Sequence, residues 1–302
     1  MATLQAATTR RRVPGPGSSA GSVDRKRMLA GIPVAERRLE LGGVSTAVLE
    51  GGTGPPLLLL HGGIESGGAY WALVASHLAA THRLVIPDLP GLGESEPVAR
   101  LDDAAFGEWL AALLQLTCDR KPVLVAHSLA GGLAARFAAE QGDLLQRLVI
   151  YGTPGLGRYR MPPGLMLAAV RFDLRPTQRN QERFERWAFL DSDRTKRQDR
   201  EWFDAFDAYS VSCGRVRHVK RAMRQLIRAE TKRTPEAVLL RIGTPASLLW
   251  GRHDRMVPLR LAETASASLG WPLRVIDGAG HAPHLEQPGA FVAALRAVLG
   301  GS

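Results

Sequence analysis

Residues 122–132 read Pro-Val-Leu-Val-Ala-His-Ser-Leu-Ala-Gly-Gly, and they decide the fold of this chain. The apolar run Val123–Val125 is typical of a buried strand, and the small residues of Ala130–Ala139 are typical of a helix. Ser128 lies between them, where a strand that turns directly into a helix holds a serine on a strained corner. There the first turn of the helix supplies N–H groups and the positive end of its dipole. The stretch therefore predicts that Ser128 is placed to act as a nucleophile.

A nucleophilic serine needs a base and an acid that orients the base, and both candidates follow in the chain. Asp254 ends the segment Leu-Leu-Trp-Gly-Arg-His-Asp, and His281 lies in Gly-Ala-Gly-His-Ala-Pro-His. We expect His127, within the serine corner, to be a packed neighbour rather than a second base, because its backbone direction is opposite to that of Ser128. Ser128, Asp254 and His281 are thus the candidate catalytic residues.

The composition is that of an ordinary globular protein. The chain has 302 residues, of which 45% are hydrophobic and 23% charged. Its longest apolar runs are too short to span a bilayer. The two cysteines, Cys118 and Cys213, form neither a disulfide framework nor a zinc spacing, which favours a reducing, cytoplasmic location. The sequence contains no metal-binding, phosphate-binding or nucleic-acid motif, so we expect neither a cofactor nor a nucleic-acid partner.

The net charge of +10 is unevenly distributed. Residues 1–35 carry a balance of +5 and residues 156–235 a balance of +9, so the remainder is mildly acidic. Only five of the 39 cations are lysines, which favours a solvated, arginine-rich helical surface over a binding site. The alternative is an anionic substrate or partner near residues 156–235.

The pattern of elements predicts an α/β fold with a doubly wound, mostly parallel sheet. Residues 1–35 have the composition of a disordered basic tail. A hairpin is expected over Arg37–Leu41 and Val44–Leu49. The parallel strands are expected at Leu57–Leu60, Arg83–Ile86, Val123–Ala126, Leu148–Tyr151, Ser247–Trp250 and Leu273–Ile276. The helices between them are expected at Ala69–Ala80, Ala104–Leu116, Leu129–Glu140, Leu259–Leu269 and Pro288–Leu299.

The alternation of strands and helices is interrupted over residues 155–235, which have helical spacing. We expect residues 36–154 and 236–302 to form the core and residues 155–235 to form a helical cap over the carboxyl ends of the strands. Its aromatic residues Trp187, Trp202 and Phe206, together with Ile64, are the candidate lining of a substrate pocket.

Several motifs, taken jointly, resemble the α/β-hydrolase fold superfamily, in the branch that carries a helical cap. Besides the serine corner, they are His61-Gly-Gly63, Asp88-Leu-Pro-Gly-Leu-Gly-Glu-Ser95, Trp250-Gly-Arg-His-Asp254 and Gly280-His281-Ala-Pro. The resemblance covers about residues 36–300. Ala126 and Ala130 stand where the family has the two glycines of G-x-S-x-G, which adds one methyl group at each place.

The resemblance also implies roles for other residues. The acid of the family can follow the strand after the nucleophile, but Tyr151-Gly-Thr-Pro154 offers no carboxylate, so Asp254 has no rival. The amides of Leu129 and Gly63, with Ile64 as the fallback, are expected to form the oxyanion hole. The resemblance implies that Glu286 caps or braces the last helix. Independently of the resemblance, Glu65 lies just beyond the oxyanion loop and is expected to be a solvated loop carboxylate, with contact to a substrate as the alternative.

The resemblance implies a serine hydrolase, most simply a carboxylic-ester hydrolase that acts through an acyl-enzyme on an apolar small-molecule ester. Epoxide hydrolases and haloalkane dehalogenases of the superfamily use aspartate at the position of Ser128, which argues against both. Two alternatives stay open. One is a hydrolase of the carbon–carbon bond in a diketone or ring-fission product, and the other is a receptor-like protein that keeps the triad but only binds. The sequence does not indicate an oligomeric state.

Overall fold

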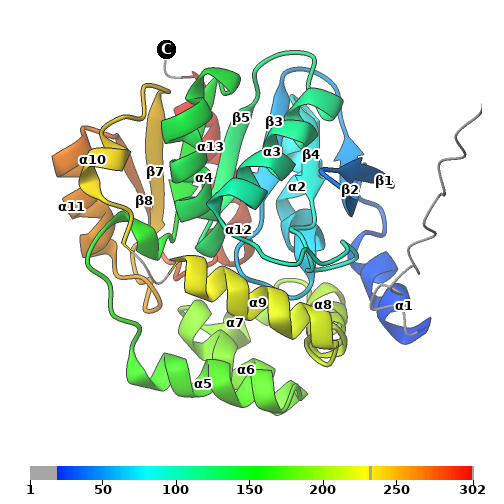
Figure 1. Ribbon diagram of the computed structural model, residues 1–302. Coiled ribbons are helices and arrows are strands. Elements are labelled where there is room, and N and C mark those ends of the chain that lie inside the picture. The colour runs from blue at the N-terminus through cyan, green and yellow to red at the C-terminus, as the bar shows by residue number, and fades with distance from the viewer. Residues whose placement is uncertain (1–18, 231–232, 301–302) are drawn as a thin grey trace, which may run out of the picture.

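The computed structural model describes residues 19–230 and 233–300. Within these residues lies an eight-stranded sheet in the order β1-β2-β4-β3-β5-β6-β7-β8 (Figure 1). β1 and β2 form an antiparallel hairpin, β2 pairs antiparallel with β4, and the later pairs are parallel. The doubly wound, mostly parallel sheet predicted from the sequence is therefore confirmed. The strands are β1 Ala35–Leu41, β2 Val44–Gly51, β3 Pro56–Leu60, β4 Arg83–Pro87, β5 Val123–His127, β6 Arg147–Tyr151, β7 Ala246–Gly251 and β8 Leu273–Ile276.

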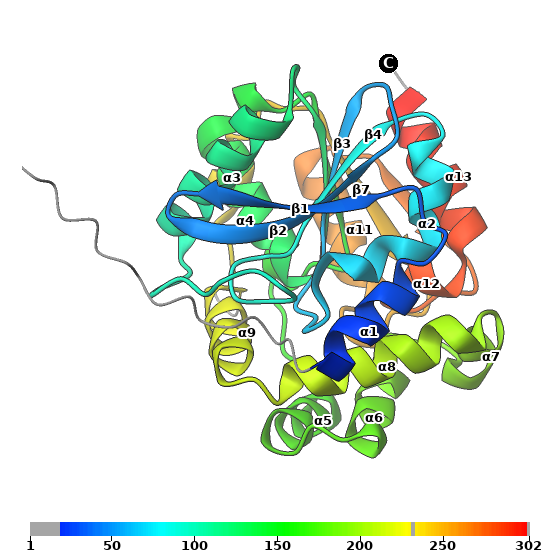
Figure 2. The same ribbon diagram turned by 90° about the vertical axis from the view of Figure 1, so that its right-hand side faces the viewer.

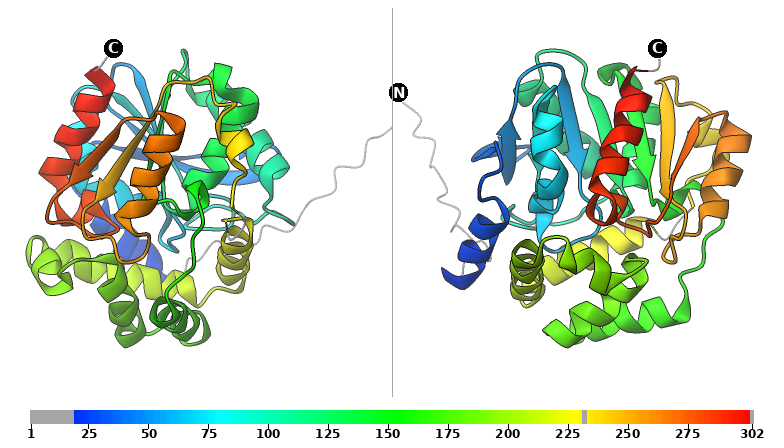
Figure 3. Two further views of the ribbon diagram at one scale, coloured as in Figure 1. Left: turned by 90° about the vertical axis from the view of Figure 1, so that its left-hand side faces the viewer. Right: turned by 180° about the vertical axis from the view of Figure 1, so that it is seen from behind.

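The central strands are mostly apolar because both faces of the sheet are covered. Alternate residues point to opposite faces, so Leu58 and Leu124 belong to one core and Leu57 and Val125 to the other. The first core includes side chains of α3, α4 and α11, and the second those of α2 and α13. Figure 3 shows α2 and α13 together on the back of the sheet. These helices are α2 Ala72–Ala79, α3 Asp103–Thr117, α4 Leu129–Gln141, α11 Leu259–Leu269 and α13 Pro288–Gly300.

Between β6 and β7 the chain leaves the sheet and forms a group of helices, which lies below the sheet in Figure 1. We call residues 155–235 the inserted segment. Its helices are α5 Pro163–Leu174, α6 Gln178–Ala188, α7 Ser192–Arg197, α8 Arg200–Gly214 and α9 Arg217–Glu230. The remaining short elements are η1 Gly67–Trp71, η2 Gly142–Leu144, η3 Pro154–Leu156, α10 Glu236–Leu239 and α12 Pro283–Glu286.

The N-terminal region differs from the expected disordered tail over residues 1–35. Residues 1–18 lie outside the described residues, but Ser19–Met28 form helix α1, which lies beside α8 (Figure 2). Met28 is 1% exposed, and its carbonyl oxygen accepts a hydrogen bond from the indole N–H of Trp202 at 3.2 Å. The helix is polar in composition, and its order comes from tertiary contacts that a composition average cannot register.

Within the described ranges, none of the helices combines the length and the apolar character that crossing a bilayer requires.

Candidate active site

Ser128 occupies the corner between β5 and α4. Its φ is 50°, which makes it the one non-glycine residue with positive φ in the described part of the chain. Such a backbone conformation is strained for a serine and persists only where the surroundings hold it. The Ser128 amide donates to the carbonyl oxygen of Tyr151 at 2.9 Å, and Ala126 and Ala130 are fully buried on either side. The two alanines are therefore accommodated at the corner.

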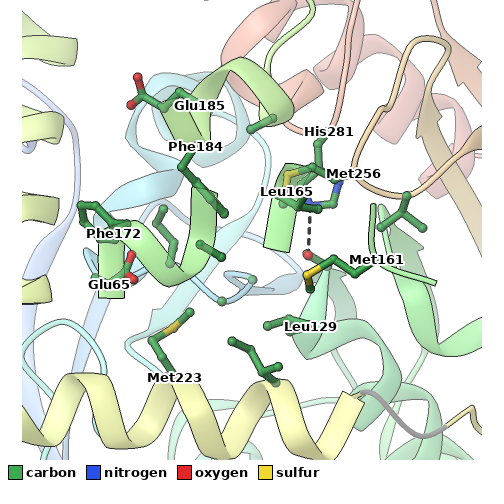
Figure 4. Close-up of a pocket in the computed structure, with 18 of the residues that line it drawn as sticks. Glu65, Leu129, Met161, Leu165, Phe172, Phe184, Glu185, Met223, Met256 and His281 are labelled. Carbon is green, nitrogen blue, oxygen red and sulfur yellow. Dashed lines mark hydrogen bonds between the residues drawn. The ribbon is translucent and has the colours of Figure 1, made fainter. Parts of the chain in front are cut away.

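The three candidate catalytic side chains form one hydrogen-bonded chain. Nε2 of His281 lies 2.9 Å from Oγ of Ser128, and Nδ1 of His281 lies 2.8 Å from Oδ2 of Asp254. The dashed line from His281 in Figure 4 marks the bond to the serine. Oδ1 of Asp254 accepts the amides of Met256 and Val257, both at 2.8 Å, which fixes the carboxylate. This geometry lets the imidazole accept the serine proton while the aspartate orients the ring.

The loop that carries His281 is held by the inserted segment. The His281 amide donates to the carbonyl oxygen of Ala188, the last residue of α6, at 2.7 Å. The Glu286 carboxylate accepts the amides of Gly280 at 2.8 Å and Leu190 at 2.7 Å. Glu286 thus ties the histidine loop to the chain that follows α6, which differs from the expected role of bracing the last helix. The sequence contains no local signal for this contact.

The amides of Gly63 and Leu129 are the candidates for an oxyanion hole. Among the described residues, the amides of Gly63 and Leu129 have no hydrogen-bond acceptor within the protein. The Ile64 amide donates to the carbonyl oxygen of Gly62 at 2.8 Å, so the fallback residue is already engaged. A Cβ atom on Gly62 would lie 2.8 Å from Cβ of Ser128, which explains the glycine at this close approach.

His61 fixes the Gly62–Gly63 turn. The Leu89 amide donates to Nε2 of His61 at 2.9 Å, which leaves Nδ1 to donate to the Gly62 carbonyl oxygen at 2.7 Å. Burial lowers the pKa of His61 to about 3, so the ring stays neutral. The tautomer is thereby set by its two backbone partners.

His127 and His284 both contact Tyr151, and His127 also contacts the backbone of His281. The His127 ring stacks on Tyr151 with centroids 4.3 Å apart, and its Nε2 lies 3.0 Å from the carbonyl oxygen of His281. Nδ1 of His284 lies 3.1 Å from the hydroxyl of Tyr151. Burial lowers the pKa of both histidines. These contacts agree with the prediction that His127 is a packed neighbour.

A cavity of about 400 Å³ opens beside Ser128 and His281, between the core and the inserted segment. Ile64 and Phe206 line it as expected, but Trp187 and Trp202 do not. The Trp202 ring stacks on Phe206 with centroids 5.3 Å apart and bonds to α1, and Trp187 packs at Gly164. Helical spacing alone could not tell which side of α6 or α8 faces the cavity. Tyr70 also lines the cavity. Further apolar lining residues, labelled in Figure 4, include Leu129, Leu165, Phe172, Phe184, Met223 and Met256.

Four carboxylic acids, Glu65, Asp173, Glu185 and Glu230, also line this largely apolar cavity, and burial raises the pKa of the three glutamates. Burial, and to a smaller extent Asp173, raises the pKa of Glu65 to about 7. This half-buried side chain is not the solvated carboxylate expected from the sequence. Burial also raises the pKa of Glu230 to about 7 and that of Glu185 to about 8, although each has a cationic partner. Arg136 lies 2.6 Å from Glu230, and Lys196 contacts Glu185.

The described residues contain no group of three or more His, Cys, Asp or Glu side chains that could hold a metal ion.

Comparison with known proteins identifies the family. Residues 57–295 match the alpha/beta hydrolase family. The chain belongs to this family. It is 30% identical over 280 residues to the pimeloyl-[acyl-carrier protein] methyl ester esterase of Aeromonas salmonicida, a match that covers 85% of this chain and all of that protein.

Two further similar proteins have names that indicate different reactions. The structure of a thermophilic esterase from Thermogutta terrifontis superposes with a TM-score of 0.71 and 26% identity, over 88% of this chain and 98% of that one. A 2-hydroxymuconate semialdehyde hydrolase from a Pseudomonas species is 31% identical over 132 residues, which are 41% of this chain and 45% of that protein.

Proposed function

We propose that this alpha/beta hydrolase cleaves carboxylic esters through an acyl-enzyme formed on Ser128. The observation that carries the proposal is the hydrogen-bonded chain from Oγ of Ser128 through His281 to Asp254, which opens onto an apolar cavity. The similarity to an esterase over 85% of this chain supports the same class.

In the first step, Oγ of Ser128 attacks the ester carbonyl carbon while Nε2 of His281 takes the serine proton. Asp254 holds the imidazole in the required tautomer and stabilises the imidazolium that forms. The amides of Gly63 and Leu129 would donate to the oxyanion as charge develops on it. The C–O bond then breaks, and His281 passes the proton to the departing alcohol.

In the second step, a water molecule enters and His281 takes one of its protons. The resulting hydroxide attacks the acyl carbon, the bond to Oγ breaks, and Ser128 recovers its proton from His281. The products are the acid and the free enzyme.

We assign the inserted segment as a cap that selects the substrate. Its side chains Leu165, Phe172, Phe184 and Met223 are among the apolar residues that line the cavity beside Ser128. An apolar acyl or alcohol group would fill this space, since burying it there is favourable. Glu65 would face the end of such a group and would accept a hydrogen bond from a polar substituent.

A second candidate is hydrolysis of a carbon–carbon bond in a ring-fission product. It is favoured by the local similarity to 2-hydroxymuconate semialdehyde hydrolase, although that match covers under half of this chain. Against this candidate, Ala282 and Pro283 follow His281, at a place where such hydrolases often have tryptophan.

Steady-state turnover separates these functions. We expect p-nitrophenyl esters, tested from acetate to decanoate, to turn over faster than about 0.1 per second, against a typical enzyme median of about 10 per second. Cleavage of a ring-fission product with no ester turnover would favour the second candidate. A protein that only binds would turn over neither substrate, while a ligand would raise its melting temperature.

A further inference from the structure

Helix α5 presents an unusual apolar side to solvent. Nine large apolar side chains of the described residues are exposed, and four of them lie on this one helix. Met166 is 51% exposed, Leu167 49%, Val170 48% and Leu174 68%. Residues 166, 170 and 174 are spaced by four, and residues 167 and 174 by seven, so the four side chains share one side of the helix. Figure 1 shows α5 at the outer edge of the molecule, on the side away from the sheet.

The same helix forms a wall of the cavity beside Ser128. Leu165, Ala169 and Phe172 line the cavity from the inner side of α5. Val170 both lines the cavity and is half-exposed, so it lies where the cavity meets the surface. The exposed apolar side of α5 is therefore continuous with the mouth of the cavity.

The surface around this apolar side is positively charged. Six arginines in residues 158–186 are exposed, namely Arg158, Arg160, Arg171, Arg175, Arg179 and Arg186. The acids in that range are Asp173, Glu182 and Glu185, and none of them is exposed. Asp173 is paired with Arg224 at 2.6 Å, and Glu185 with Lys196. Residues 158–186 thus present six exposed arginines and no exposed acid.

We propose that this surface docks onto an anionic lipid bilayer. We call it the α5 face and define it as Met166, Leu167, Val170, Leu174, Arg171 and Arg175. A helix side with apolar residues in the middle and arginines at the flank suits the membrane–water interface. There the leucines would contact acyl chains and the arginines would contact anionic headgroups. A second copy of the chain fits less well, because the arginines of the two faces would oppose one another. Docking would let an apolar ester pass from the bilayer into the cavity beside Val170 without crossing water.

Vesicle co-sedimentation tests the proposal directly. The probes are vesicles of phosphatidylglycerol and phosphatidylcholine in equal parts, and vesicles of phosphatidylcholine alone. We expect the wild-type protein to bind the anionic vesicles more strongly, and to bind them several-fold less when NaCl is raised from about 0.1 to about 0.5 M. The double variant Leu167→Asp/Leu174→Asp should lose at least about tenfold in partitioning, and Arg171→Glu/Arg175→Glu should lose the preference for anionic lipid.

The matched control is Leu116→Asp/Leu240→Asp, which changes two leucines of similar exposure, 57% and 62%, outside α5. It should bind like the wild type. None of the variant positions lines the cavity, so melting temperature and turnover of a soluble short ester serve as checks of folding. Vesicle binding is measured without hydrolysis, so its result is independent of the proposed function.

Wild-type protein that fails to bind vesicles, or both leucine double variants binding equally, would overturn the proposal. Light scattering then tests the remaining explanation, which is that the α5 face joins two copies of the chain. A dimer that dissociates in Leu167→Asp/Leu174→Asp, without vesicle binding by the wild type, would assign the α5 face to self-association instead.

Discussion

The guanidinium of Arg25, on helix α1, lies 3.1 Å from the carboxylate of Asp88, and the side chains are 5% and 0% exposed. The Asp88 carboxylate also accepts the amides of Gly68 at 2.5 Å and Glu94 at 2.7 Å. Arg25 donates to the Ser66 carbonyl oxygen at 3.3 Å as well. An N-terminal residue outside the matched family segment therefore fixes two loops, one of which follows the Gly62–Gly63 turn.

Replacing Arg25 should strongly destabilise the protein. Arg25→Met leaves Asp88 buried without its cationic partner, and we expect the free energy of unfolding to fall by about 3–5 kcal/mol. Arg27→Met is the matched control, because this neighbouring side chain is 46% exposed, and it should change the value by less than about 0.5 kcal/mol. Urea denaturation measures both. Equal stability of the two variants would mean that α1 is not docked in solution.

The parts of the site that the sequence predicted are those encoded locally. The corner at Ser128 and the loops that carry Asp254 and His281 follow directly from strand ends, because the carboxyl ends of parallel strands meet at one edge. Contacts between distant segments were not predictable in the same way. The Arg25–Asp88 pair, the Ala188–His281 hydrogen bond and the position of Glu65 all depend on how the inserted segment and α1 pack on the core. The expectation that Trp187 and Trp202 line the pocket is wrong, because the spacing of residues along a helix does not show which side of the helix faces the cavity.

Asp254→Asn should remove most of the activity without unfolding the protein. The Asn oxygen can still accept the amides of Met256 and Val257, but its NH₂ group then faces Nδ1 of His281 and favours the wrong tautomer. We expect kcat to fall about 10⁴-fold. Asp277→Asn, at a side chain that is 77% exposed, is the control and should leave kcat unchanged. A loss below about tenfold for Asp254→Asn would mean that another group orients His281.

Glu65 should make the protein less stable as the pH rises. Burial raises the pKa of Glu65 from 4.5 to about 7, so its favourable contribution is complete below pH 4.5 and is lost as the pH approaches 7. Glu65→Gln keeps the neutral shape at every pH. Relative to the wild type, it should have little effect at pH 4.5 and gain about 1–3 kcal/mol in unfolding free energy at pH 8.

Denaturant titrations at the two pH values measure this difference. The control is Glu201→Gln, whose side chain is 83% exposed, and its effect should not change with pH. A Glu65→Gln variant that behaves like this control would place the Glu65 carboxyl in water.

Substrate length preference should depend on Phe184 and not on Trp187. Phe184 lines the cavity, whereas Trp187, also on α6, does not. Phe184→Ala enlarges the cavity and should shift the ratio of kcat/KM between long and short p-nitrophenyl esters by about ten- to a hundredfold. Trp187→Ala should leave that ratio unchanged, even where it lowers stability. The opposite pattern would show that α6 is rotated relative to the structure described.

The central claim is that Ser128 is the nucleophile, and covalent labelling tests it most directly. Intact-mass measurement after treatment with a fluorophosphonate should show one adduct on the wild type and on Ser268→Ala, which changes an exposed serine of α11. Ser128→Ala should show no adduct, with kcat on any ester that the wild type cleaves reduced about 10⁴- to 10⁶-fold. An undiminished adduct on a folded Ser128→Ala protein would place the nucleophile elsewhere and contradict the account.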